Sequence, residues 1–282
     1  MLSAISAEAL KLTRHKASWF LVWIYPIAFL IIFALLIGDA AIDPDPPQAQ
    51  APDEWIDGTV VAWHVPNQAM GRYLIAAFVA LAFAGEYGWN TWKLIVPHRA
   101  RASLIAAKYV VIFALFAVSL FLAAVVTLIG GWTTDTVAGH PIPDGVNAGT
   151  ILAAHAQAAL VALAPGLVTI GYASLAAVLT RSTIAGLVIA IVAVTVEGLV
   201  FRFGPMLSAR APDLMWGLYQ ALPGYHLANL QDWIVEGRAL RAELMGAGAV
   251  ELGWATSLAV TVAWIAGLFG LTFGAFRRQD LN

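Results

Sequence analysis

The sequence predicts an all-α polytopic membrane protein with six transmembrane helices, organised as a single transmembrane domain over residues 1–282. Two observations predict this fold class. The chain is 61% hydrophobic and only 11% charged, whereas soluble domains are about 45–50% apolar and about 25% charged. Its apolar residues also gather in stretches long enough to cross about 30 Å of hydrocarbon, which takes roughly 20 helical residues.

The first expected element precedes the first span. Apolar side chains recur there at steps of three and four residues, and charged side chains lie on the other faces. This periodicity predicts an amphipathic helix lying in the cytoplasmic membrane interface. The apolar positions are Leu2, Ile5, Ala9 and Leu12, and the charged positions are Glu8, Lys11 and Arg14.

Six spans follow, at approximately 17–38, 65–85, 109–132, 151–179, 182–201 and 252–276. The first has 22 uncharged residues, more than the 7–15 of a signal-peptide core, so we interpret it as an uncleaved span. In the second, only 13 uncharged residues separate Arg72 from Glu86. Arg72 is therefore expected inside the span, with its aliphatic stem snorkelling outward.

The distribution of positive charge predicts that both termini are cytoplasmic. Ten of the fifteen Lys and Arg residues fall on the side of the N-terminus, and the first outer loop holds six acidic residues without a basic one. The inner set is Lys11, Arg14, Lys16, Lys93, Arg99, Arg101, Lys108, Arg181, Arg277 and Arg278; the outer set is Arg72, Arg202, Arg210, Arg238 and Arg241. The alanine-rich composition with small loops is typical of a bacterial plasma (inner) membrane protein.

Three outer loops are expected. The Pro- and acid-rich loop from Asp39 to Trp55 should be extended and solvated. The loop from Thr133 to Ala148 should be irregular, because it contains two prolines and two glycines. The loop from Arg202 to Glu251 is apolar but interrupted by Pro223-Gly224, which predicts a pair of short re-entrant helices with a turn at that dipeptide. A surface amphipathic loop is the alternative.

The 86–108 segment, EYGWNTWKLIVPHRARASLIAAK, concentrates polar, basic and tryptophan residues between the second and third spans. A short helix parallel to the membrane would place its Trp rings at headgroup level and its Lys and Arg side chains toward the cytoplasm. The segment is thus a candidate contact for a soluble partner. An ordinary positively charged loop with interfacial tryptophans is the alternative.

The chain lacks the motifs of an enzyme. It has no cysteine, no G-x-x-x-x-G-K-[ST] phosphate loop, no H-E-x-x-H, no G-x-S-x-G, and no His/Asp/Glu set with metal-ligand spacing. We therefore expect no catalytic residues, no metal and no cofactor on this chain. A net charge of -2 without a basic run also gives no indication of nucleic-acid binding.

Polar residues inside the spans are candidate pathway residues, because a charge in hydrocarbon usually faces a partner or water. Glu197 in the fifth span is expected to pair with Arg202 by snorkelling, or else to take part in a pathway. His155 and Gln157 in the fourth span are expected to form interhelical hydrogen bonds, with a proton relay as the alternative. Gln68 and Arg72 are candidates for lining a cleft at a dimer interface.

The 86–108 segment resembles the corresponding region of the permeases of type-2 ABC transporters. The resemblance rests on a carboxylate ending the second span, a Thr five residues on, a Leu, a Pro, nearby Arg residues, and a Lys at the start of the third span. These are Glu86, Thr91, Leu94, Pro97, Arg99, Arg101 and Lys108. The amphipathic N-terminus, the six spans and the long last outer loop are also similar, whereas Asn90 replaces a usual Gly.

The resemblance implies a permease that dimerises with a second copy or a paralogue and binds a separate ATP-binding cassette ATPase, which holds the ATP and Mg²⁺. It implies ATPase-coupling positions at Glu86, Thr91, Lys93, Pro97, Arg99 and Arg101, with secondary contacts at Glu8, Lys11 and Arg14. A weak similarity to drug and bacteriocin-immunity exporter permeases favours export of a lipophilic or amphipathic drug, peptide or lipid-linked substrate.

Other functions remain open from the residues alone. An ion- or proton-coupled secondary carrier would use Glu197, His155 and Arg72, although no internal repeat supports that architecture. A membrane-embedded enzyme is disfavoured, because no carboxylates or histidines cluster at one depth. A scaffold anchor would not require six spans.

Overall fold

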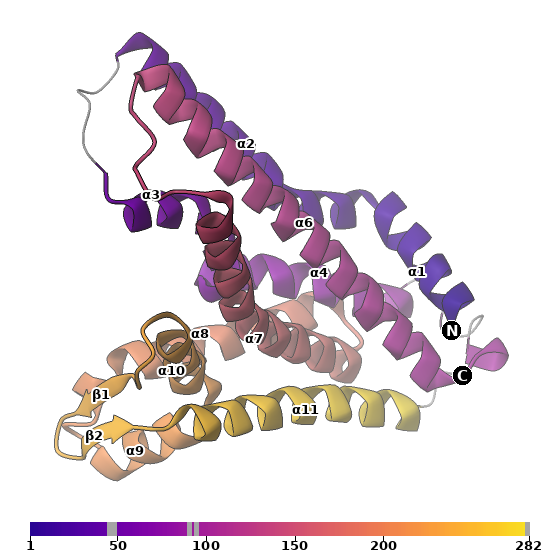
Figure 1. Cartoon of the computed structure of the whole chain (residues 1–282). Helices are drawn as coiled ribbons and strands as arrows, with labels where there is room; N and C mark the ends of the chain where they lie inside the picture. The colour runs from indigo at the N-terminus through magenta and orange to yellow at the C-terminus, as the bar shows by residue number, and fades with distance from the viewer. Residues whose placement is uncertain (44–49, 89–91, 93–95, 280–282) are drawn as a thin grey trace. The chain divides into compact units, whose positions relative to one another are not determined.

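The structure is a computed structural model that describes residues 1–43, 50–88, 92 and 96–279. Six helices in the described part are long and apolar enough to cross a membrane, which confirms the six predicted spans (Figure 1). They are α2 (Lys16–Ile42), α4 (Ala69–Gly88), α6 (Arg101–Ala138), α7 (Ala148–Thr180), α8 (Thr183–Leu207) and α11 (Trp254–Arg278). The chain is therefore a multi-pass membrane protein.

The chain divides into two compact units. Unit 1 comprises Met1–Val65 and Tyr109–Ala162, and unit 2 comprises Pro66–Lys108 and Leu163–Asn282. The boundary after Lys108 lies inside α6, and the boundary after Ala162 lies inside α7. Each unit is described separately below.

Unit 1 begins with α1 (Leu2–Arg14), which confirms a helix at the N-terminus. Of the predicted apolar face, Leu12 is buried whereas Leu2 is exposed. Helices α2 and α6 then run side by side (Figure 1): the Ser119 hydroxyl donates to the Val22 carbonyl, and Gly130 leaves room for the Phe33 ring. Small residues at such a crossing allow two helices to approach closely within a membrane.

The acid-rich outer loop was predicted to be extended, and this is wrong for its second half. Residues Pro52–Thr59 form helix α3. Pro52 stands at the first helical turn with Asp53 and Glu54 after it, a composition that favours a helix N-terminus. The buried Trp55 fixes the helix in place, since its indole N–H donates to the Asp135 carboxylate at 2.6 Å.

Two predicted boundaries also differ from the structure. Residues Val61–Asn67 form the short 3-10 helix η1 around Pro66, so the second span starts at Ala69 instead of near residue 65. The loop expected from Thr133 is helical as far as Ala138. Thr133 and Thr136 donate their hydroxyls to carbonyls four residues back, which occupies the polar side chains without breaking the helix.

Unit 2 contains α4, η2 (Val96–His98), α8 and α11, together with the first two turns of α6 and the second half of α7. The predicted pair of short helices is present as α9 (Pro212–Ala221) and α10 (Pro223–Val235), with Pro223 beginning α10. Tyr219 and Tyr225 from these helices pack with Leu244 and Val250 in a small core.

A two-stranded antiparallel sheet corrects the all-α prediction. Strand β1 (Arg241–Leu244) pairs with β2 (Gly248–Glu251), with Arg241 opposite Glu251. Gly246 and Gly248 adopt φ values of 80° and 85°, a left-handed conformation that the turn requires and that glycine adopts without strain.

Helices α7 and α8 are joined by a two-residue corner at Arg181 and Ser182. Ser182 caps α8 by accepting a hydrogen bond from the Ala185 amide, and Arg181 adopts a φ of 55°. Beyond the corner, a Cβ atom on Gly186 would come within 2.8 Å of the Ala177 Cα atom. The corner is therefore closely packed and set by backbone contact.

Candidate functional site

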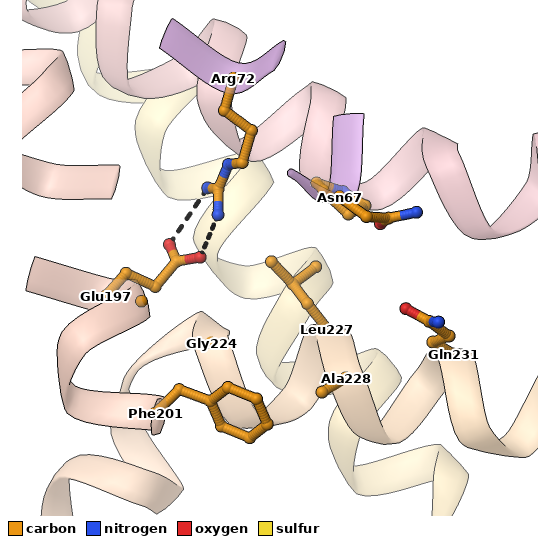
Figure 2. A pocket seen from close by; sticks show the side chains of 10 residues that line it. Asn67, Arg72, Glu197, Phe201, Gly224, Leu227, Ala228 and Gln231 are labelled. Atoms are coloured by element: carbon orange, nitrogen blue, oxygen red, sulfur yellow. Dashed lines mark hydrogen bonds and ion pairs between the residues drawn. The ribbon is translucent and has the colours of Figure 1, made fainter. Parts of the chain in front are cut away.

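Unit 2 buries an ion pair between two spans. Arg72 of α4 donates from Nη1 to Glu197 Oε1 of α8 at 2.5 Å and from Nη2 to Oε2 at 3.3 Å (Figure 2). The two residues are 7% and 4% exposed. The paired N–H groups of a guanidinium match the two oxygens of a carboxylate, so this is the bidentate geometry of a strong ion pair.

This arrangement corrects two predictions. Arg72 does not snorkel outward but is buried against Glu197, and Glu197 does not pair with Arg202, which is exposed. Five residues along an α-helix correspond to a rotation of about 140°, so Arg202 leaves from another face of α8. The partner lies 125 positions away in sequence, in a different helix.

Further hydrogen bonds connect the pair to α7. Arg72 Nε donates to the Thr169 hydroxyl at 2.7 Å, and Thr169 donates onward to the Pro165 carbonyl at 2.8 Å. The Tyr172 hydroxyl donates to Glu197 Oε2 at 3.1 Å. The network thus joins α4, α7 and α8 and supplies hydrogen-bonding partners for both buried charges, as a charge out of water requires.

A cavity of about 200 Å³ lies beside the ion pair. It is lined by Asn67, Arg72, Pro165, Glu197, Gly198, Phe201, Gly224, Leu227, Ala228 and Gln231. Gly224 packs closely there, because a Cβ atom at this position would come within 3.1 Å of both the Cγ and the carbonyl oxygen of Glu197. Sequence analysis missed Asn67, Phe201 and Gln231, and the predicted Gln68 is exposed and does not line the cavity.

His155 lies in the half of α7 that belongs to unit 1. It forms hydrogen bonds to other helices, as the sequence predicts. The Trp63 indole N–H donates to His155 Nδ1 at 3.1 Å, and His155 Nε2 lies 3.3 Å from the Thr59 hydroxyl. Thr59 donates to the Ile56 carbonyl, so a neutral His155 with its proton on Nε2 satisfies all three groups. Gln157 is exposed.

A second buried ion pair lies within the 86–108 segment. Glu86 was predicted to end the second span, but α4 continues to Gly88 and buries this carboxylate. Lys108 Nζ donates to Glu86 Oε1 and to the Ala82 carbonyl, each at 2.9 Å. The same ammonium group lies 5.2 Å from the centre of the Trp92 ring, a cation–π distance.

The segment is also attached to the C-terminal end of α11. Arg101 Nη1 donates to the carbonyls of Phe276, Arg277 and Gln279 at 3.3, 2.8 and 2.6 Å. A cation at a helix C-terminus complements both the unpaired carbonyls and the negative end of the helix dipole. Trp92 packs on Phe276 with ring centres 4.5 Å apart.

Gln279 extends this attachment to two further helices. Its Oε1 accepts from the Tyr87 hydroxyl at 2.5 Å, and its Nε2 donates to the Val178 carbonyl near the end of α7 at 2.6 Å. Pro97 and Arg99 are exposed around η2. Thr91 and Lys93, two of the predicted coupling positions, lie outside the described residues.

The remaining predicted positions are on α1 in unit 1. Lys11 and Glu8 form an ion pair at 2.8 Å on that helix, and Arg14 is exposed. In the described part of the chain, no group of three or more His, Cys, Asp or Glu side chains is placed to hold a metal ion.

Comparison with known families gives a match to a family profile. Residues 4–198 match the family described as ABC-2 family transporter protein. The match extends from α1 through Glu197 of α8, so it includes Arg72 and the whole 86–108 segment. A search of curated protein sequences gave no match.

Proposed function

The chain belongs to the ABC-2 transporter family, and from this premise we propose that it is the permease subunit of an ATP-driven exporter. Family membership supports a permease role and implies an ATP-binding partner subunit. In our proposal two permeases, either two copies or a pair of paralogues, form the transport path in the plasma membrane with their termini in the cytoplasm. Each binds a separate ATPase subunit that holds ATP and Mg²⁺, and the cargo is a lipophilic or amphipathic drug, peptide or lipid-linked molecule.

The attachment of the 86–108 segment to other helices is the observation that supports this proposal. A partner that drives transport must move several spans by contacting a small area. Arg101 and Trp92 connect the segment to the end of α11, and Lys108 connects the start of α6 to α4 through Glu86. A displacement of the segment would therefore move α4 and α11 with it, because the connecting groups are buried or bonded to backbone.

Within this proposal the segment has two kinds of residue. Glu86 and Arg101 position it from the inside, since their side chains are already bonded to this chain. Pro97 and Arg99 are exposed and are the described positions that we assign to ATPase contact. We assign Thr91 and Lys93 to the same contact on sequence grounds, with Glu8, Lys11 and Arg14 of α1 as secondary contacts.

The ion-coupled carrier receives less support. Both Glu197 oxygens accept hydrogen bonds from Arg72, and one accepts another from Tyr172. His155 belongs to the other unit, where it is bonded to Trp63 and Thr59. These contacts fit structural roles for both groups. A carrier would transport in response to a proton gradient without any ATPase, and this distinguishes the two functions.

The decisive experiment is co-purification of the tagged chain with the ATP-binding subunit encoded beside it, followed by an ATPase assay in lipid nanodiscs. We expect a stoichiometric complex whose ATPase activity depends on the permease. Reversing the charges with Lys93→Glu and Arg99→Glu should remove that dependence without unfolding the permease. Arg238→Glu and Arg241→Glu make the same change in charge at exposed positions on the predicted outer side, so they are the matched control.

Either of two results would contradict the proposal. If the permease is monodisperse but binds no ATPase, the partner-driven function is wrong and proton-coupled transport should be assayed next. If the complex forms but the Lys93 and Arg99 reversals act like the Arg238 and Arg241 control, the 86–108 segment is not the site of coupling.

A further inference from the structure

The cavity beside Arg72 and Glu197 contains a polar group without a partner. The side-chain nitrogen of Asn67 is buried and has no hydrogen-bond partner among the described residues. A buried donor left unpaired costs about 1–3 kcal/mol, so nearly all such groups in folded proteins are paired with protein, water or ligand. Asn67 lines the cavity, and a rotation of its side-chain amide would turn the unpaired donor toward a bound molecule.

The side chains divide the cavity into a polar side, a charged side and an apolar floor. Figure 2 shows Asn67 and Gln231 on one side and the Arg72–Glu197 pair on the other, with Leu227, Ala228 and Phe201 between them. Gln231 is exposed and makes its amide available as both donor and acceptor. Because η1 and α10 each contribute a side-chain amide, the cavity suits a ligand group that both donates and accepts hydrogen bonds.

The charges of the lining determine the charge of the ligand. Arg72 and Glu197 are the only ionisable residues in the lining, and each compensates the other at 2.5 Å. An anion would find no unpaired positive charge here and would lie close to the negative Glu197 carboxylate. A cation would likewise find no unpaired negative charge and would lie close to the positive Arg72 guanidinium. The cavity therefore favours an uncharged polar group.

The volume limits how much of a ligand enters. Pockets for drug-sized molecules measure about 300–1,000 Å³, whereas this cavity measures about 200 Å³. It accommodates a head group but not a whole amphipathic molecule. Phe201 and Leu227 supply apolar contact for the atoms that join such a head group to its hydrocarbon part.

We propose that this cavity binds the uncharged hydrogen-bonding head group, an amide or a hydroxyl, of an amphipathic molecule, with Asn67 Nδ2 donating to its oxygen. Gln231 contacts the head group from the neighbouring helix α10, and the Arg72–Glu197 pair forms the far wall. The molecule is either a membrane lipid or a transported compound, and the two have this chemistry in common. The inference is independent of the ATPase proposal, because binding is measured without ATP or a partner subunit.

The absence of cysteine from the chain gives a direct assay. Ala228→Cys places a single thiol in the lining, and its reaction with N-ethylmaleimide is followed on the full chain in phosphatidylcholine nanodiscs. The probes are octanamide, octanoate and octyltrimethylammonium, which share a hydrocarbon chain length and differ in charge. Ala263→Cys is the matched control, because it lines a separate cavity of unit 2 whose lining contains no charged residue.

Octanamide at ten times its Kd should slow modification of the Ala228→Cys thiol about tenfold, and it should leave Ala263→Cys unaffected. Octanoate and octyltrimethylammonium should protect much less. Adding Asn67→Leu should weaken octanamide binding about fivefold, the effect of losing one net hydrogen bond. Gln231→Leu, at an exposed position, should weaken it in the same direction and remains informative if Asn67→Leu does not fold.

Three results would overturn the proposal: no protection by octanamide, stronger protection by octanoate, or unchanged protection when both Asn67→Leu and Gln231→Leu are folded. The first would assign the unpaired Asn67 donor to water alone. A final arm identifies the source of the ligand. If nanodiscs containing monogalactosyldiacylglycerol slow the modification without octanamide, the ligand is a membrane lipid; if they do not and octanamide does, it is a transported compound.

Discussion

Breaking the Arg72–Glu197 pair from one side should destabilise the protein far more than removing both charges. Arg72→Met leaves the Glu197 carboxylate with the single hydrogen bond from Tyr172, and Glu197→Leu leaves the guanidinium with the one to Thr169. Because both residues are less than 10% exposed, each remaining charge would exchange its ion pair for the limited water that the adjoining cavity admits. Removing one partner of such a pair costs about 3–5 kcal/mol.

The two single variants should not be equal. A lone carboxylate can be neutralised by a proton, but a guanidinium stays charged. We therefore expect Arg72→Met to lower the free energy of unfolding by about 3 kcal/mol and Glu197→Leu to lower it by about 5 kcal/mol. The double variant replaces the pair with apolar side chains of similar size, which is often neutral in buried sites. It should lie within about 1 kcal/mol of the wild type, giving a large coupling energy in the double-mutant cycle.

Equilibrium unfolding by SDS in mixed micelles, followed by circular dichroism, measures all four proteins. Tyr73→Phe is the control, because it removes an uncharged hydrogen bond of 2.6 Å to Thr195 between the same two helices, α4 and α8. Its cost should be about 0.6–1 kcal/mol. If the losses of the two single variants simply add up in the double variant, the reasoning is refuted, since the two charges would then not stabilise each other.

Glu197→Gln should likewise reduce stability more than transport; a fully stable Glu197→Gln protein without transport would instead assign Glu197 to the pathway.

Three further predictions concern other contacts. Arg101→Gln should free the C-terminal end of α11, at a cost of about 1–2 kcal/mol, and speed amide hydrogen exchange there, whereas Arg99→Gln at an exposed position should not; equal exchange in both would contradict the cap. Gly186→Val should destabilise the α7–α8 corner by about 1–3 kcal/mol through overpacking, whereas Gly270→Val should be close to neutral, because a Cβ atom there meets nothing within 4 Å and valine is a better helix former than glycine. Lys108→Met should cost about 3–5 kcal/mol by leaving a buried carboxylate; a wild-type melting temperature would show that the pair contributes nothing.

The six spans and the two short helices between the fifth and sixth spans were predictable because both depend on local patterns. Hydrophobic length identifies a span whatever its neighbours are, and Pro223 followed by Gly224 favours the start of a new helix. Helix α3 was missed because the acidic composition was read as solvation, although Pro52, Asp53 and Glu54 also form a standard helix start. The turn glycines Gly246 and Gly248 were the available signal for the hairpin.

The candidate site was harder to predict because its contacts are distant in sequence. Glu197 and Arg72 were both recognised as unusual, but helical spacing offers only local partners, and Arg202 was the nearest cation. The true partner is 125 positions away and depends on how α4 packs against α8. Asn67 gave no signal, since an amide before a span becomes informative only when its lack of a partner is known. Gln231 gave none either, because its place at the cavity depends on how α10 packs.

The tight corner between α7 and α8 has a consequence for how the protein is made. Two residues separate these spans, so they cannot cross the membrane independently and should enter the bilayer together as a helical hairpin. Glu197 therefore arrives in hydrocarbon with α7, whose Tyr172 already provides one hydrogen bond. Arg72 is synthesised earlier, and until the hairpin inserts its charge in α4 has no oppositely charged partner from α8. Insertion of the hairpin would neutralise it, and ordered assembly of unit 2 is then driven by charge as well as by hydrophobicity.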